Sequence, residues 1–130
     1  MAGTPILGRA KLIAFVATTQ PDAAKVFYED VLGLKLISDE RPFALVFDAN
    51  GTMVRLAAVA KHEPAPFTVL GWQVEGIETV VARLAHAHVT CLRYPGMNET
   101  DPLGIWKSPG GARVAWFHDL DGNVLSVTEF

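Results

Sequence analysis

The chain has little that would support several large classes of function. Its 130 residues include one cysteine, Cys91, which excludes an internal disulfide and a zinc site built from several cysteines. No apolar run approaches the roughly 20 residues that a membrane-spanning helix needs. The 11 Lys and Arg residues are scattered, without a cluster suited to a phosphate backbone. We therefore expect no membrane partner and no nucleic-acid partner.

Targeting segments and common catalytic motifs are missing as well. The N-terminus has no charged stretch followed by an apolar core, so no signal peptide and a cytoplasmic location are expected. We find no nucleophile elbow, P-loop or dinucleotide-binding motif. Half of the residues are hydrophobic and the formal net charge is −3, a balance that excludes a disordered chain. The length suits one globular domain over residues 1–130.

The first half of the chain, residues 9–59, changes from strand periodicity to helix periodicity and back. Residues 9–17 have the pattern of a buried strand, and apolar side chains then recur at helical spacing from Pro21 to Leu32. Gly33 is expected to end this helix, because glycine adopts the positive φ that often follows a helix. Three further strands are predicted at residues 34–39, 43–49 and 52–59, with a hairpin turn at Asn50-Gly51. The predicted order is βαβββ.

The same order begins again after a polar linker at residues 60–66. The pattern predicts a strand, a helix and three more strands, at residues 67–74, 77–87, 89–94, 113–118 and 124–130. The last two strands flank Asp121-Gly122, a second hairpin signal. Between matching landmarks the second half is about 16 residues longer, which we assign to an inserted loop at residues 96–110.

These landmarks indicate an internal duplication. Gly51 in the first hairpin corresponds to Gly122 in the second, and Gly33 corresponds to His88. Histidine tolerates a positive φ poorly, so the second helix either ends differently or is strained at this residue. Two unrelated α+β halves are the alternative to a duplication.

Two motifs carry a resemblance to a known family. They are FYEDVLGL at residues 27–34 and VAWFHDLDGN at residues 114–123. Together with the paired βαβββ order over residues 9–130, they resemble the vicinal oxygen chelate superfamily. That superfamily includes glyoxalase I, extradiol dioxygenases, fosfomycin-resistance enzymes and bleomycin-binding proteins. The resemblance implies an α+β fold in which two tandem βαβββ modules, at residues 9–59 and 67–130, form a curved mixed-sheet cleft. It also implies a homodimer.

The resemblance further implies where a metal would bind. Metal-dependent members place His, Gln or Glu ligands on the first and last strand of each module. The matching positions in this sequence are Ile13, Arg55, Val69 and Ser126. Isoleucine and valine have no donor atom, arginine repels a divalent cation, and serine alone is a poor ligand. We therefore expect no cofactor, and a divalent metal only if this alignment is wrong.

Strand alternation assigns side chains to the faces of each sheet. Four apolar residues are expected beneath the helices: Val54, Leu56, Leu125 and Val127. On the opposite faces, Met53, Arg55 and Ser126 would line the cleft. The resemblance adds Trp116 to this face, and the inserted loop brings Trp106 over its mouth. These five residues are the candidate ligand-binding set.

This set predicts the chemistry of the ligand. Arginine has a planar fork that suits a carboxylate or a phosphate, and aromatic walls are typical of small-molecule sites. We therefore expect an anionic small molecule with an apolar or aromatic body. Simpler interpretations stay open: Arg55 pairs with a carboxylate such as Asp48, Trp116 fills the core, and Trp106 is a dimer contact.

A metal-free small-molecule-binding protein is the favoured function. The alternative is a lyase, isomerase or dioxygenase of the glyoxalase type that depends on a metal or on His118. Histidine titrates near neutral pH, which makes His118 a weak candidate for a general acid or base.

Overall fold

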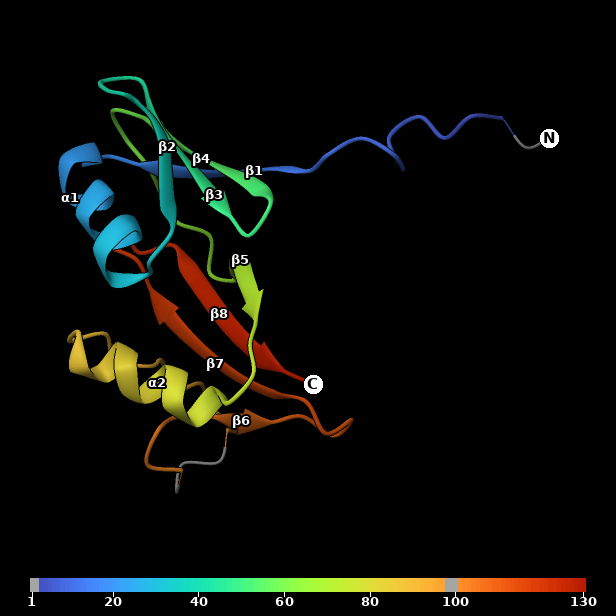
Figure 1. Ribbon diagram of the computed structural model, residues 1–130. Coiled ribbons are helices and arrows are strands. Elements are labelled where there is room, and N and C mark those ends of the chain that lie inside the picture. Colours follow the sequence, from blue (N-terminus) through green and yellow to red (C-terminus); the bar gives the residue numbers. More distant parts are fainter. Residues whose placement is uncertain (1–2, 98–100) are drawn as a thin grey trace.

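Two sheets of four strands each make up the fold in the part of the chain that the computed structural model describes, residues 3–97 and 101–130 (Figure 1). Module one contains β1 (Ile13–Thr18), α1 (Pro21–Val26), η1 (Phe27–Val31), β2 (Lys35–Glu40), β3 (Ala44–Ala49) and β4 (Thr52–Ala58). Module two contains β5 (Thr68–Gln73), α2 (Ile77–His86), β6 (Trp106–Lys107), β7 (Arg113–His118) and β8 (Val124–Glu129).

The two sheets share one topology. Their strand orders are β1-β4-β3-β2 and β5-β8-β7-β6. In each sheet the first strand pairs in parallel with the last, and the other pairings are antiparallel. This arrangement confirms the predicted α+β fold of two tandem βαβββ modules. Among the described residues, no helix combines the length and the apolar character needed to cross a membrane.

Helix η1 explains how two adjacent aromatic residues are both buried. Its turn is wider than that of an α-helix, as the hydrogen bond from the Leu32 N–H to the Phe27 oxygen (3.0 Å) shows. Phe27 and Tyr28 both lie in the core, where their rings meet edge to face at 5.5 Å. The sequence motif FYEDVLGL therefore anchors module one through consecutive aromatic side chains.

The helices of the two modules end in the same way. Gly33 follows η1 with a φ of +77°, as predicted, and His88 follows α2 with a φ of +65°. Of the two possibilities that the sequence left open, the strained histidine is the one observed. A left-handed conformation costs a residue with a side chain roughly 1–2 kcal/mol, which module one avoids with glycine.

The predicted strand at residues 89–94 is wrong. This segment has no strand, although its Leu92 N–H donates to the Trp116 oxygen of β7 (2.7 Å). The edge next to β7 is partly taken by β6, whose Trp106 pairs with Val114. Strand β6 comes from the predicted inserted loop at 96–110, of which residues 98–100 lie outside the described residues.

The first strand is also shorter than predicted. Residues 9–12 lie before β1 and are exposed, because the ladder with β4 starts where Ile13 meets Met53. In Figure 1 the chain before β1 extends away from both sheets.

The core confirms the faces that alternation assigned. Val54, Leu56, Leu125 and Val127 are all buried in one cluster.

The helical segments η1 and α2 line one cavity, so both modules place their helices on the same side. Strands β1 and β5 contact each other, so the two sheets meet at these edges. The faces without helices consequently lie on the other side.

A buried carboxylate joins the two modules. Asp119, in the turn after β7, accepts a hydrogen bond from the Tyr28 hydroxyl (2.6 Å) and another from the Asn123 side-chain amide (2.8 Å). The same amide donates to the Ala17 oxygen of β1 (2.9 Å). Burial, followed by the charge of Asp119, raises the pKa of Tyr28 far above its usual range, so its hydroxyl stays a donor.

Asp121 in the same turn caps the junction of β1 and α1. Its carboxylate accepts hydrogen bonds from the hydroxyls of Thr18 (2.5 Å) and Thr19 (2.7 Å), and from the Thr19 N–H (2.8 Å). Burial alone would raise the pKa of Asp121, but these hydrogen bonds outweigh it and lower the pKa. The turn at 119–123 thus connects module two to the start of module one through hydrogen bonds.

Candidate functional site

Three aromatic rings form a cluster on the second sheet, on the face without a helix. Trp116 of β7 contacts Tyr94 edge to face, with ring centroids 5.4 Å apart, and Trp106 of β6 at 5.8 Å. All three side chains are half-buried. The sequence predicted Trp106 and Trp116 for one site, and the structure brings them together; Tyr94 was not predicted, since its segment was expected to be a regular strand.

Ser126 lies next to this aromatic cluster. It is the cross-strand neighbour of Trp116, and on its other side it faces Gly71 of β5. A Cβ at Gly71 would lie only 2.6 Å from the Ser126 hydroxyl oxygen. The glycine therefore leaves the space that the buried Ser126 side chain occupies.

Arg55 lies on the first sheet, on the face without a helix, between Phe15 of β1 and Val46 of β3. Its guanidinium forms an ion pair with Glu40 at 3.3 Å. The simpler interpretation, in which Arg55 pairs with a neighbouring carboxylate, is thereby confirmed, with Glu40 in place of the suggested Asp48, whose carboxylate accepts the N–H of Gly51 in the hairpin turn.

The structure thus divides the candidate set between the two sheets. Met53 and Arg55 belong to module one, whereas Trp106, Trp116 and Ser126 belong to module two. Among the described residues, no hydrogen bond or ion pair connects Arg55 to module two. The two groups share the side of the molecule that faces away from the helices.

His118 ends β7 and is exposed. Together with Arg93 and Tyr94, it lines a shallow depression of about 370 Å³, which the prolines of the linker, Pro64 and Pro66, also border. This depression lies beside the aromatic cluster, since Tyr94 belongs to both.

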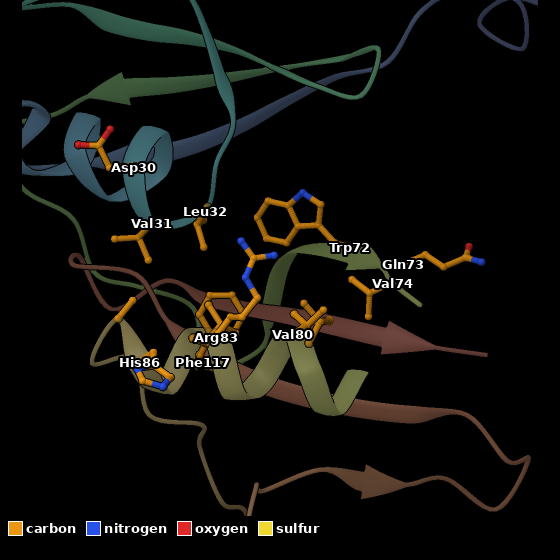
Figure 2. Close-up of a pocket in the computed structure, with 13 residues that line it drawn as sticks. Asp30, Val31, Leu32, Trp72, Gln73, Val74, Val80, Arg83, His86 and Phe117 are labelled. Carbon is orange, nitrogen blue, oxygen red and sulfur yellow. The ribbon is translucent and has the colours of Figure 1, made fainter. Parts of the chain in front are cut away.

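A larger cavity of about 530 Å³ lies on the opposite side, between η1, β5 and α2 (Figure 2). Its walls include Trp72 and Arg83, which no sequence motif indicated. Trp72 is the cross-strand neighbour of Val127 and shares its face of the sheet. Alternation along β5 would have placed Trp72 beneath the helices, but no sequence pattern shows that two helices leave a gap there.

Comparison with known families decides the identity of the fold. A sequence model described as the Glyoxalase/Bleomycin resistance protein/Dioxygenase superfamily matches residues 10–127. The chain belongs to this superfamily. The resemblance carried by the two motifs is thereby confirmed.

Solved structures of superfamily members have the same fold. A lactoylglutathione lyase from Agrobacterium tumefaciens has a TM-score of 0.74 at 16% identity, with 95% of each chain covered. A superfamily member from Sphaerobacter thermophilus has a TM-score of 0.70 at 22% identity, covering 92% of this chain and 96% of its own. A third, from Alicyclobacillus acidocaldarius, reaches 0.69 at 13% identity, covering 94% and 92%. Among curated proteins, none matches this chain.

The four positions that the sequence aligns with the metal ligands of metal-dependent superfamily members do not fit a metal here. Ile13 and Val69 provide no donor atom, and Arg55 carries a positive charge that already pairs with Glu40. Of the four, only Ser126 has an oxygen atom in its side chain. Among residues 3–97 and 101–130, no three His, Cys, Asp or Glu side chains are grouped as metal ligands would be.

Proposed function

We propose that this superfamily member is a cytoplasmic, metal-free small-molecule-binding protein. Its ligand has an aromatic or apolar body and an anionic group, and it lies on the side of the sheets that the helices leave free. The aromatic cluster of Tyr94, Trp106 and Trp116 carries the proposal. Half-buried rings on an uncovered sheet face offer a flat apolar surface to an aromatic ligand.

Arg55 supplies the anion-binding group in this proposal. Its neighbour Phe15 is 65% exposed, so apolar surface adjoins the guanidinium. Glu40 competes with the ligand for Arg55, because its ion pair must open before a ligand carboxylate can bind in a bidentate manner. The pair is partly exposed and contributes at most about 1 kcal/mol, so a ligand can displace it.

Quenching of tryptophan fluorescence by 2-naphthoate tests the proposal. The Trp72→Phe variant confines emission to Trp106 and Trp116, the other two tryptophans of the chain. We expect Arg55→Met to weaken binding about tenfold, the value of a hydrogen bond to a charged group. Glu40→Gln should strengthen binding, because the competing carboxylate is removed. Equal binding of the neutral 2-naphthamide, or no effect of Arg55→Met, would contradict the proposal.

A glyoxalase-type reaction is the second candidate. It is favoured by the exposed His118, which shares a depression with Arg93 and Tyr94. One structural neighbour is named a lactoylglutathione lyase, so lactoylglutathione is the substrate to test. Turnover that is lost in His118→Asn would establish this reaction. Elemental analysis is the companion measurement, and stoichiometric nickel, zinc, manganese or iron would overturn the metal-free proposal.

We also propose that the protein is a homodimer. Leu12, Ile13 and Phe15 are 74%, 45% and 65% exposed, a run of apolar surface at the start of β1. Such a patch is unusual on a monomer and suits a second copy. Sedimentation should give twice the mass of the chain, and Leu12→Glu, a change outside the proposed ligand cleft, should reduce it to the monomer.

A further inference from the structure

The cavity between the two modules is apolar at its base. Phe117, Leu84 and Val127 form this base, and all three belong to the buried core. Val80 of α2 and Leu32 after η1 provide further apolar walls. A volume of about 530 Å³ falls within the range typical of small-molecule sites.

The rim of this cavity carries a cationic group that has no carboxylate partner among the described residues. Arg83 of α2 extends toward Trp72 and Leu32, across the opening between α2, β5 and η1 (Figure 2). Asp30 lines the other side of the opening, and no ion pair connects it to Arg83 within the described part of the chain. A guanidinium above an apolar base, beside an indole, is suited to a carboxylate with an apolar body.

We propose that this cavity is a second binding site, which takes an amphipathic monocarboxylate. The apolar body of the ligand contacts Phe117, Leu84 and Val127, and its carboxylate accepts hydrogen bonds from Arg83. Trp72 covers the junction between the two parts. The site is separate from the proposed cleft, because Phe117 and Trp116 are adjacent on β7 and point to opposite faces of the sheet.

Fluorescence of Trp72 reports binding to this site alone. In the full chain with Trp106→Phe and Trp116→Phe, Trp72 is the remaining tryptophan. We expect a saturable change in its emission with decanoate, and binding at least several-fold weaker for the neutral decan-1-ol. A parallel titration with 2-naphthoate distinguishes a straight-chain body from an aromatic body. Since the tryptophans of the cleft are removed, the result does not depend on the function proposed above.

Two variants test the roles of charge and space. Arg83→Met should weaken decanoate binding about tenfold and leave decan-1-ol binding unchanged, since only the carboxylate loses its partner. Arg9→Met, in the exposed N-terminal segment, is the matched control for loss of one positive charge and should have no effect. Val80→Phe fills the cavity and should abolish binding of both compounds.

Three results would overturn the proposal: unchanged Trp72 emission with both acids, equal affinity for decanoate and decan-1-ol, or equal affinity of the Arg83→Met and Arg9→Met variants. Arg83 and Arg9 are both exposed, so neither substitution disturbs the core. Binding to these two variants therefore remains measurable even if Val80→Phe fails to fold.

Discussion

Removing one oxygen atom at the junction of the modules should destabilise the whole protein. In Tyr28→Phe the ring stays in the core beside Phe27 and Phe47, so the packing is kept. The loss is the 2.6 Å hydrogen bond to Asp119, a residue that is only 6% exposed. A hydrogen bond to a charged acceptor contributes about 1.5–3 kcal/mol.

Asp119 keeps other donors in this variant, namely the Asn123 amide and the N–H groups of Asp121 and Asn123. We therefore expect a loss near the middle of that range, about 2 kcal/mol, and a Tm lower by roughly 6–10 °C. Urea unfolding at pH 7 measures the free energy, and the m-value should not change.

A double-mutant cycle separates this bond from general effects of the substitution. In an Asp119→Ala background the Tyr28 hydroxyl has lost its acceptor, so Tyr28→Phe should cost almost nothing or stabilise slightly. An equal cost in both backgrounds, or a loss below about 0.5 kcal/mol in the native background, would refute the assigned role of the Tyr28–Asp119 bond.

Three further predictions concern stability and are tested by thermal or urea unfolding. The lowered pKa of Asp121 contributes stability above about pH 4. The Tm difference between the native chain and Asp121→Asn should therefore shrink as the pH falls from about 7 to about 3. A difference that stays constant over this range would contradict the assignment. Gly71→Ala should cost about 1–3 kcal/mol by clashing with Ser126, and Gly71→Ala with Ser126→Ala should recover most of it. Gly33→Ala should destabilise by about 1 kcal/mol, while His88→Gly should stabilise by roughly 0.5–1 kcal/mol, because both residues have a positive φ.

The sequence was sufficient for features that depend on local periodicity. Alternation placed Val54 and Leu56 beneath a helix, and the Asn50-Gly51 hairpin lies where the turn signal predicted it. Gly33 could be predicted as a helix end because glycine adopts a positive φ readily, whatever surrounds it. The same reasoning identified His88 as the exception.

Features that depend on contacts between elements could not be predicted. Residues 89–94 have the composition of a strand, but the partner edge of β7 is partly occupied by β6. The ion-pair partner of Arg55 proved to be Glu40 of β2, two strands away in the sheet, while the Asp48 carboxylate accepts the Gly51 N–H. The cavity beside Arg83 exists only because η1 and α2 come from different modules and do not close against each other.

The turn at 119–123 also constrains the order in which the protein folds. The hydrogen-bond partners lie far apart in the sequence: 103 residues separate Thr18 from Asp121, and 91 residues separate Tyr28 from Asp119. During synthesis module one emerges first, but its buried hydroxyl and the start of its helix lack these acceptors until module two is nearly complete. The duplicated halves are therefore expected to assemble late and together, as a slow step set by long-range contacts, and module one expressed alone should fold poorly.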